Sequence, residues 1–476
     1  MSHLLRRTAF GARPDEREAF SRVTYAAAVD GLLNFDPSQT DVDNKIGASG
    51  YANITATTAF SPNTNIDHAR QRWLFRMVHS PAPLQEKMAL IWHQHFATAY
   101  SKVNGTYGNV DATRMMAAKQ ADDPARMKGQ IDLFRETGLG SFRDLLVNVA
   151  KDPAMLVWLD GRLNTKGQPQ ENFGRELMEL FTFGVENYVE TDVYAAARVF
   201  TGWNLAIANR DTVNSSYTFN YIANNHDVAA KDFSFAIYSN GSKRIEARSA
   251  GSGMQDGLDL IDALATHPET AKRLARRFWF WFVSETEEPE ESFVSSISKV
   301  YLQSDTNIKP VVRAVLLSPQ FIDSAHRYQR YSWPVEYSVR AMKEVGFAGF
   351  SVDNARSALI NMGQQLFEPP DVNGWELGPG WFSTGGMLAR MNYAAVLATN
   401  QKFALRDAAK PAASSPESLV EFVKSALSVP DLSGTTTNAL LDYARAGGYT
   451  GTDAQLLNKA GGLFHLLVGS GEFQFV

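Results

Sequence analysis

The sequence contains no cysteine among its 476 residues. Disulfide bonds, thiolate nucleophiles, cysteine-ligated iron–sulfur clusters and cysteine-type zinc sites are therefore excluded. A metal ion bound by this chain must take its protein ligands from histidine, aspartate and glutamate.

The sequence also lacks a long apolar run and an excess of positive charge. No stretch approaches the roughly 18 apolar residues that a membrane-spanning helix requires, so we expect no membrane span. The net charge is −5, from 46 lysines and arginines against 51 aspartates and glutamates, and the basic residues are scattered along the chain. A nucleic-acid partner is therefore not expected.

The first residues contain an arginine pair, Arg6-Arg7, but no apolar segment follows it. The continuation "GARPDEREAF" is charged instead. This disfavours a twin-arginine export signal, and the chain as given shows no signal peptide. We expect either a cytoplasmic protein or the mature form of an exported one, and the sequence does not choose between them.

Apolar residues at helical spacing dominate what the sequence does contain. Hydrophobic residues make up 44% of the chain, enough for a large core. Segments such as "EKMALIWHQHFATAYSKV" place them three and four positions apart, whereas "YTFNYI" and "DFSFAIY" alternate as short strands do. We predict a mainly α, multi-helical globular body over residues 1–400 with a small β insertion around 204–250. A linker and a small helical segment are predicted at 401–476.

Ionisable residues gather in the segment "ENFGRELMELFTFG". On a helical wheel, Glu171, Asn172, Arg175, Glu176 and Glu179 occupy an arc of roughly 140°, opposite the apolar residues. An ordinary solvated face with ion pairs four residues apart explains this pattern as well as an active-site helix does. We take the four charged residues as catalytic candidates and Asn172 as a substrate-binding one.

A second polar group follows on a predicted loop, "NNHDVAAKDF". His226, Asp227 and Lys231 lie within six positions there. A histidine beside a carboxylate can transfer protons, hold a metal ion or bind an anion, although such a pair also serves to cap a loop. We take His226 and Asp227 as catalytic candidates, with Lys231 and the preceding Trp203 as substrate-binding ones.

The motif "LIWHQHF" places His93 and His95 two positions apart on a predicted helix. Side chains two apart diverge by about 200°, so both could bind one metal ion only if the helix ends or distorts near Phe96. The alternative is that each is a hydrogen-bonded core histidine. His93 and His95 are the metal-ligand candidates, and a divalent metal is the cofactor we consider.

The segment "LFEPPDVNGWELGPGWF" is a rigid turn that presents carboxylates beside tryptophans. Aromatic rings next to hydrogen-bond acceptors suit a carbohydrate, whose C–H faces pack on rings. The alternative is a rigid loop whose tryptophans fill the core. We take Trp375 and the following Arg390 as substrate-binding candidates.

Several of these motifs together resemble a known family. The segments "HLLRRTAFGARPDE", "EKMALIWHQHF", "ENFGRELMELFTFG", "HDVAAKDF" and "LFEPPDVNGW" occur in the order typical of the bacterial domain of unknown function 1800 family. The resemblance runs from His3 to about Thr399. It implies no established activity, but it implies frequent export and a sulfatase-like partner protein. After Lys231 the chain departs from the family, which commonly has Leu-Gly where this sequence has "DFSFAIYSNG".

The simplest explanation of these separate groups is one shared pocket in which Glu176 and His226 lie together. We then expect a hydrolase or transferase that acts on a hydroxyl-rich substrate, a saccharide or an ester, with paired carboxylates as acid and base and with or without a metal ion. The alternative is a non-catalytic scaffold that partners another protein of the same locus. The apolar stretch "RRFWFWFVSE" favours this alternative weakly.

Overall fold

The first half of the chain is a succession of short helices around one buried helix. The computed structural model describes residues 1–36, 41–48, 51, 60–345, 352–429 and 431–476. The helices of this half are α1 (Ser2–Ala9), α2 (Pro14–Ser21), α3 (Tyr25–Leu33), α4 (Ile66–His79), α5 (Pro83–His95), α6 (Tyr100–Tyr107), α7 (Asn109–Ala117), α8 (Gln130–Thr137), α9 (Phe142–Ala150), α10 (Pro153–Trp158), α11 (Asn172–Glu176) and α12 (Glu190–Val199).

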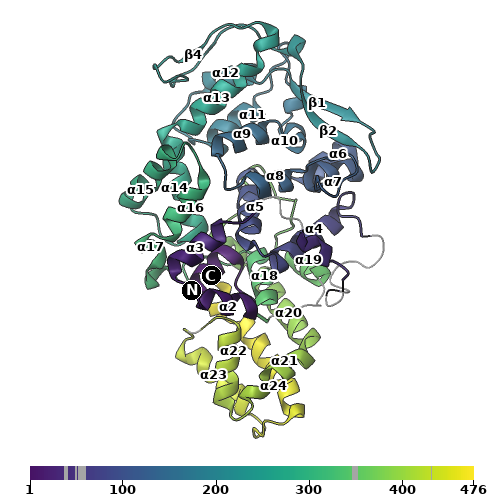
Figure 1. Cartoon of the computed structure of the whole chain (residues 1–476), viewed down its shortest axis with the longest axis vertical. Coiled ribbons are helices and arrows are strands. Elements are labelled where there is room, and N and C mark those ends of the chain that lie inside the picture. Colours follow the sequence, from purple (N-terminus) through teal and green to yellow (C-terminus); the bar gives the residue numbers. More distant parts are fainter. Residues whose placement is uncertain (37–40, 49–50, 52–59, 346–351, 430) are drawn as a thin grey trace.

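Helix α5 is buried along its whole length and packs against α1, α4 and α8 (Figure 1). Its sequence "EKMALIWHQHF" carries charges that need compensation in this setting. Glu86 accepts hydrogen bonds from Arg76 Nε at 2.7 Å and from Arg135 Nε at 2.8 Å. Each carboxylate oxygen therefore has a cationic donor, which offsets the desolvation of the charge.

The second half adds two further groups of helices. They are α13 (Met254–Thr266), α14 (Pro268–Phe282), α15 (Glu291–Gln303), α16 (Ile308–Leu316), α17 (Pro319–Ile322), α18 (Pro334–Val345), α19 (Val352–Asn361), α20 (Thr384–Asn400), α21 (Lys402–Ala409), α22 (Pro416–Ala426), α23 (Gly434–Arg445) and α24 (Asp453–Val468). Helices α13 to α17 lie along one side of the molecule, and α20 to α24 form its lower end in Figure 1. The predicted mainly α fold is confirmed.

The small β insertion is also present. Strands β1 (Trp203–Ala208) and β2 (Ser216–Tyr221) form an antiparallel hairpin, and β3 (Lys231–Asp232) pairs with β4 (Arg244–Ile245). The strand expected over "DFSFAIY" is wrong beyond Asp232. Its alternation reflects burial of Phe233, Phe235 and Ile237 on one side of an irregular loop, not continuous strand pairing.

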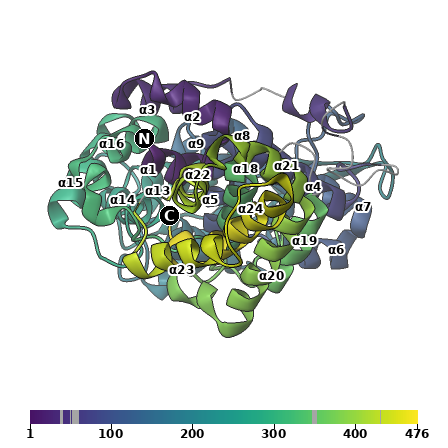
Figure 2. The same ribbon diagram turned by 90° about the horizontal axis from the view of Figure 1, so that it is seen from below.

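The C-terminal helices pack on the rest of the chain. The stretch expected to be a linker forms the end of α21, the 3-10 turn Lys410–Ala412 and the start of α22. Helix α24 packs against α20 and α21. The last residue, Val476, donates its N–H to Arg330 O at 3.0 Å, and both ends of the chain lie close together (Figure 1, Figure 2).

The arginine pair near the start is part of the core. Arg6 donates to Ser428 O at 2.9 Å and Arg7 to His326 O at 2.6 Å, and both side chains are buried. The pair therefore anchors α1 to two segments distant in sequence. The apolar stretch in α14 is likewise internal, since Phe278, Trp281 and Phe282 are buried. No helix of the described chain is long and apolar enough to cross a bilayer.

Candidate functional site

The helix expected over the segment "ENFGRELMELFTFG" is interrupted. Helix α11 ends at Glu176, and a π-helix, Leu177–Phe181, follows it directly. Thr182 then donates its hydroxyl to Leu177 O at 2.6 Å, which closes the widened turn. One continuous α-helix is therefore wrong here. π-helical turns are rare, and they occur frequently at functional sites.

Two side chains from other helices bind the carbonyl groups at the end of this π-helix. His95 Nε2 lies 3.1 Å from Phe181 O, and Arg273 Nη2 donates to Leu180 O at 3.1 Å. Burial, followed by the charges of Arg277 and Arg273, holds the pKa of His95 well below its usual range. The ring is therefore neutral, and its Nε2–H is the donor to the carbonyl.

Glu176 differs from the other charged residues predicted for the site. Its side chain is half-buried, and it makes no hydrogen bond or ion pair with any residue that the structure describes. Burial raises the pKa of Glu176 to about 7; the charge of Glu179 adds to the rise, and Arg175 opposes it. Glu179 itself accepts a hydrogen bond from the Tyr188 hydroxyl at 2.5 Å. A carboxyl group that titrates near neutral pH beside a second carboxylate can donate and accept protons.

The outer edge of the same helix is a solvated face. Arg175 Nη2 lies 3.3 Å from Glu171 Oε2, and Arg175 Nη1 lies 3.1 Å from Glu190 Oε2. The side chains of Glu171, Arg175 and Glu190 are 43%, 33% and 73% exposed. Asn172 is exposed as well, with its amide 3.4 Å from Asp160 Oδ2. At these residues the structure agrees with the alternative of an ordinary solvated face with ion pairs.

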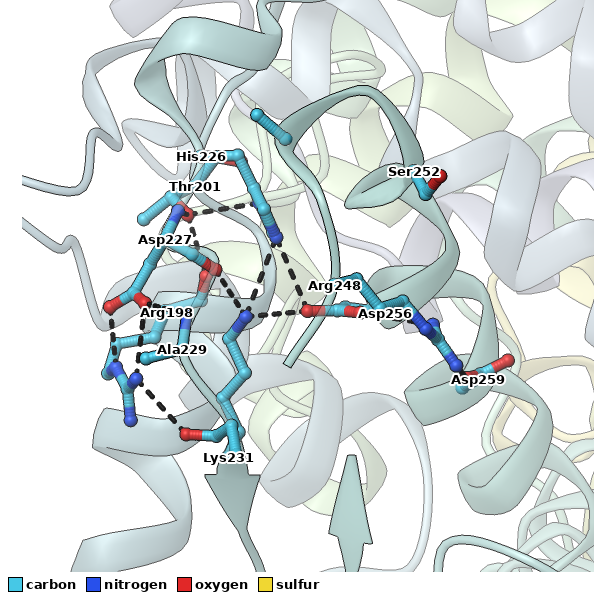
Figure 3. Close-up of polar contacts among 12 residues, drawn as sticks. Arg198, Thr201, His226, Asp227, Ala229, Lys231, Arg248, Ser252, Asp256 and Asp259 are labelled. Atoms are coloured by element: carbon cyan, nitrogen blue, oxygen red, sulfur yellow. Dashed lines mark hydrogen bonds and ion pairs between the residues drawn. The ribbon is translucent and has the colours of Figure 1, made fainter. Parts of the chain in front are cut away.

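The predicted loop residues His226 and Lys231 form a different, fully buried group, shown in Figure 3. His226 Nδ1 lies 2.9 Å from Thr201 O, and its Nε2 lies 3.3 Å from Asp256 Oδ2. Lys231 Nζ donates to the same Asp256 oxygen at 2.5 Å and also to the carbonyl of Asp227.

The far side of Asp256 extends this network. Arg248 Nη1 donates to Asp256 Oδ1 at 3.0 Å, and Arg248 Nη2 pairs with Asp259 on the next turn of α13. We call His226, Lys231, Arg248, Asp256 and Asp259 the His226 cluster. Despite burial, its hydrogen bonds and cationic neighbours hold the pKa of Asp256 below its usual range. Two cations face two carboxylates, so the buried charges are compensated.

The His226 cluster is closed to a ligand. A Cβ atom added at Gly253 would lie 2.1 Å from His226 Cδ2, so the start of α13 covers the ring. Both ring nitrogens and both Asp256 oxygens have partners. The arrangement fastens the loop after β2 to α13, and no contact joins His226 to Glu176.

Asp227 lies beside the cluster and has its own partner. Arg198 binds it in a fork, with Nε 2.7 Å and Nη2 3.2 Å from the two carboxylate oxygens. Although burial opposes ionisation, these bonds and the N–H of Ala229 hold the pKa of Asp227 below its usual range. Asp227 is therefore a partly buried loop anchor in this structure.

The remaining aromatic and basic candidates lie in the core. His93 Nε2 accepts the N–H of Phe367 at 3.1 Å, and burial lowers the pKa of His93 to about 3. His93 and His95 therefore have separate backbone partners. Across the described ranges, no group of three histidine, aspartate or glutamate side chains is arranged to hold a metal ion.

Trp203, Trp375 and Arg390 are likewise buried. Gln94 exchanges two hydrogen bonds of 2.8 Å with the backbone of Trp375, whose ring is buried. Arg390 is buried and donates to Ser332 O at 2.8 Å. Trp203 is buried so close to Gly257 that a Cβ there would approach its ring at 2.5 Å.

Sequence reasoning missed three residues that the structure brings forward. Asp256 is at the start of a helix and lies 25 to 30 positions from Lys231 and His226, so no local pattern marks it. Arg273 and Arg277 lie four apart in "ETAKRLARRFWFWF". One sequence feature could have drawn attention to Arg277: it is a charged residue between the apolar positions Leu274 and Trp281 on one helix face.

These observations define a large, mainly α-helical protein with a buried ion-pair cluster and a separate π-helical site, whose Glu176 carboxyl group has no partner in the described part of the chain. The chain belongs to the family described as protein of unknown function (DUF1800), whose family model matches residues 3–475. The match confirms the resemblance and extends it through the C-terminal helices. No curated protein and no solved structure matches the chain.

Proposed function

We propose that this protein is a hydrolase or transferase for a polar, hydroxyl-rich substrate, a saccharide or an ester, and that Glu176 transfers the proton. The observation that carries the proposal is the half-buried Glu176 carboxyl group, which has no hydrogen-bond or ion-pair partner among the described residues and has a pKa of about 7. Leaving such a group unpaired disfavours folding. Retaining it is explained most simply by a chemical role, because catalytic acids and bases need a pKa near the working pH.

The surrounding residues suit this chemistry. Protonated Glu176 can give its proton to a leaving oxygen, and ionised Glu176 can take one from water or from a hydroxyl group. Glu179, held by Tyr188, is the second carboxylate and can stabilise positive charge that develops on the substrate. Asn172 precedes Glu176 by one helical turn and offers an amide to a substrate hydroxyl.

The test is a screen of the purified chain against saccharides and esters, with and without added divalent cations. Glu176→Gln removes the titrating proton and keeps the shape, so we expect activity to fall by about 10²- to 10⁴-fold. The matched control is Glu171→Gln on the solvated edge of the same helix, which should keep full activity. Full activity in Glu176→Gln, with both variants folded by circular dichroism, contradicts the proposal.

A scaffold role is the second candidate, and one surface favours it. Helix α20 exposes Leu388, Met391 and Val396 to 59%, 49% and 45%, beside a groove of about 450 Å³ between α19 and α20. Apolar side chains gathered on one helix are typical of a protein contact. The partner that the family resemblance suggests is a sulfatase-like protein. Co-elution of the two proteins, lost in Leu388→Asp, supports this role, and separate elution opposes it.

A further inference from the structure

Helix α14 carries two arginines whose charges have no ionic partner within hydrogen-bonding distance among the residues that the structure describes. Arg277 is partly buried and makes no hydrogen bond or ion pair with any residue in the described ranges, although a guanidinium has five N–H donors. Arg273, one turn earlier, uses Nη2 on Leu180 O, while its buried Nε has no partner. The inner face of this helix therefore presents several unused donors.

The local charge balance is positive. Glu179 is the carboxylate whose charge acts on Arg273, and it already accepts the hydrogen bond of Tyr188. Burial and then the charge of Arg273 lower the pKa of Arg277 to about 10. The neighbouring His95 is neutral. Two close guanidinium groups without a full counter-charge repel each other, and an added anion would relieve that repulsion.

The neighbouring Arg276 differs from Arg273 and Arg277 because it has an ionic partner. Arg276 forms an ion pair with Glu291 at 2.5 Å, and the two side chains are 39% and 73% exposed. Gly184 lies directly against Arg273, since its φ is +86° and a Cβ there would lie 2.5 Å from Arg273 Nη1. The backbone thus approaches Arg273 as closely as glycine permits.

We propose that Arg273 and Arg277 bind an oxyanion group of the substrate on which Glu176 acts, a carboxylate, a sulfate or a phosphate. Arg273 donates to Leu180 O on the π-helix that begins directly after Glu176, and the charge of Glu179 acts on both Glu176 and Arg273. Guanidinium groups suit this ligand, since their planar forks match the oxygens of an oxyanion. This inference rests on the proposed function for the identity of the ligand as a substrate.

The experiment measures anion binding directly. Sulfate, phosphate and glucuronate are titrated into the full chain by calorimetry, with glucose as the neutral control. We expect saturable binding of the oxyanions. Comparison of the affinities for sulfate, phosphate and glucuronate shows which oxyanion group is preferred. Arg277→Gln should weaken the preferred oxyanion about ten-fold or more, which is about 1.4 kcal/mol. The matched control Arg276→Gln, on the surface of the same helix, should bind as the wild type does.

Thermal unfolding gives a second readout that does not need activity. Without an anion, Arg277→Gln should be at least as stable as the wild type, because the substitution removes repulsion with Arg273. Adding the preferred oxyanion should raise the melting temperature of the wild type and of Arg276→Gln, and should change that of Arg277→Gln much less.

The outcomes separate the two proposals. Absence of oxyanion binding, or equal affinity in Arg277→Gln and the wild type, overturns the anion site whatever Glu176 does. If Arg277→Gln does not fold, Arg277→Lys keeps the charge without the fork, and an unchanged affinity in that variant also overturns it. If Arg277→Gln loses anion affinity while Glu176→Gln keeps full activity, the anion site stands and the proposed function fails.

Discussion

The His226 cluster and the π-helical site treat charge in opposite ways. In the His226 cluster, Lys231 and Arg248 face Asp256 and Asp259, and the side chains of His226, Lys231 and Asp256 are fully buried. At the π-helical site, Glu176 is half-buried and Arg277 partly buried, and neither has a partner within the described ranges. The His226 cluster contains the motif that stands out more clearly in the sequence, whereas the π-helical site contains the hydrogen-bonding groups that remain unpaired within the described part of the chain.

This difference separates structural from chemical use of charge. A buried charge that is fully paired fixes one loop to one helix and has no capacity left for a ligand. A charge left without a partner disfavours folding unless a ligand supplies the missing contact, so its retention points to function. The comparison therefore assigns stability to the His226 cluster and chemistry to the π-helical site.

The largest expected effect is the loss of the central carboxylate of the cluster. Asp256→Asn leaves Lys231 and Arg248 buried with incomplete compensation, so the free energy of unfolding should fall by about 3–5 kcal/mol. Denaturant unfolding measures it. The control is Asp262→Asn on the same helix, which removes an exposed ion pair with Arg143 and should change stability by about 0–1 kcal/mol. A loss below 1 kcal/mol in Asp256→Asn would mean that the cluster is not a structural anchor.

The next effect tests whether the cluster is closed. Gly253→Ala places a Cβ against the His226 ring, and such overpacking should destabilise by about 1–3 kcal/mol. Gly251→Ala, where a Cβ meets no atom within 4 Å, should stay within about 0.5 kcal/mol of the wild type. Equal melting temperatures for the two variants would show that the ring has room to move.

A smaller effect concerns pH and Glu176. Its folded pKa, about 7, lies above the ordinary glutamate value of 4.5, so the folded chain holds this proton over a range in which the unfolded chain has lost it. Stability therefore decreases as pH rises from about 4.5 to about 7 and is level above that. Compared with Glu176→Gln, the wild type should lose on the order of 1 kcal/mol over this range. Parallel stability curves for the two proteins would contradict the raised pKa.

The smallest effect is expected at the solvated edge. Glu171→Gln removes one member of an exposed pair with Arg175, so stability should change by roughly 0.2–0.5 kcal/mol, and less at high salt. Thermal unfolding at two salt concentrations measures it. If the stability fell by several kcal/mol, Glu171 would have to be assigned to the interior and not to the solvated face, and the contrast with Glu176 would weaken.

Much of the fold could be predicted because helical periodicity is local. Apolar spacing of three and four residues marks α5, α9 and α14, and the alternation of "YTFNYI" marks β2. The π-helix could not be predicted, because its carbonyl groups are bound by His95 and Arg273, which come from α5 and α14. The irregular loop after Asp232 was missed because alternating apolar residues indicate burial on one side of a segment but do not indicate whether the segment pairs with another strand.

The sequence by itself determined the helical architecture, the absence of cysteine chemistry and the polar face of residues 171–179, since each depends on composition or on neighbours within one or two turns. Only the tertiary structure decided which polar side chains are paired by hydrogen bonds or ion pairs. His226 is satisfied by Asp256, thirty positions away, and Asp227 by Arg198, 29 positions away, while no side chain in the described chain forms a hydrogen bond or ion pair with Glu176. The physical reason is that desolvation and pairing depend on every element packed around a group, and distant segments supply those elements.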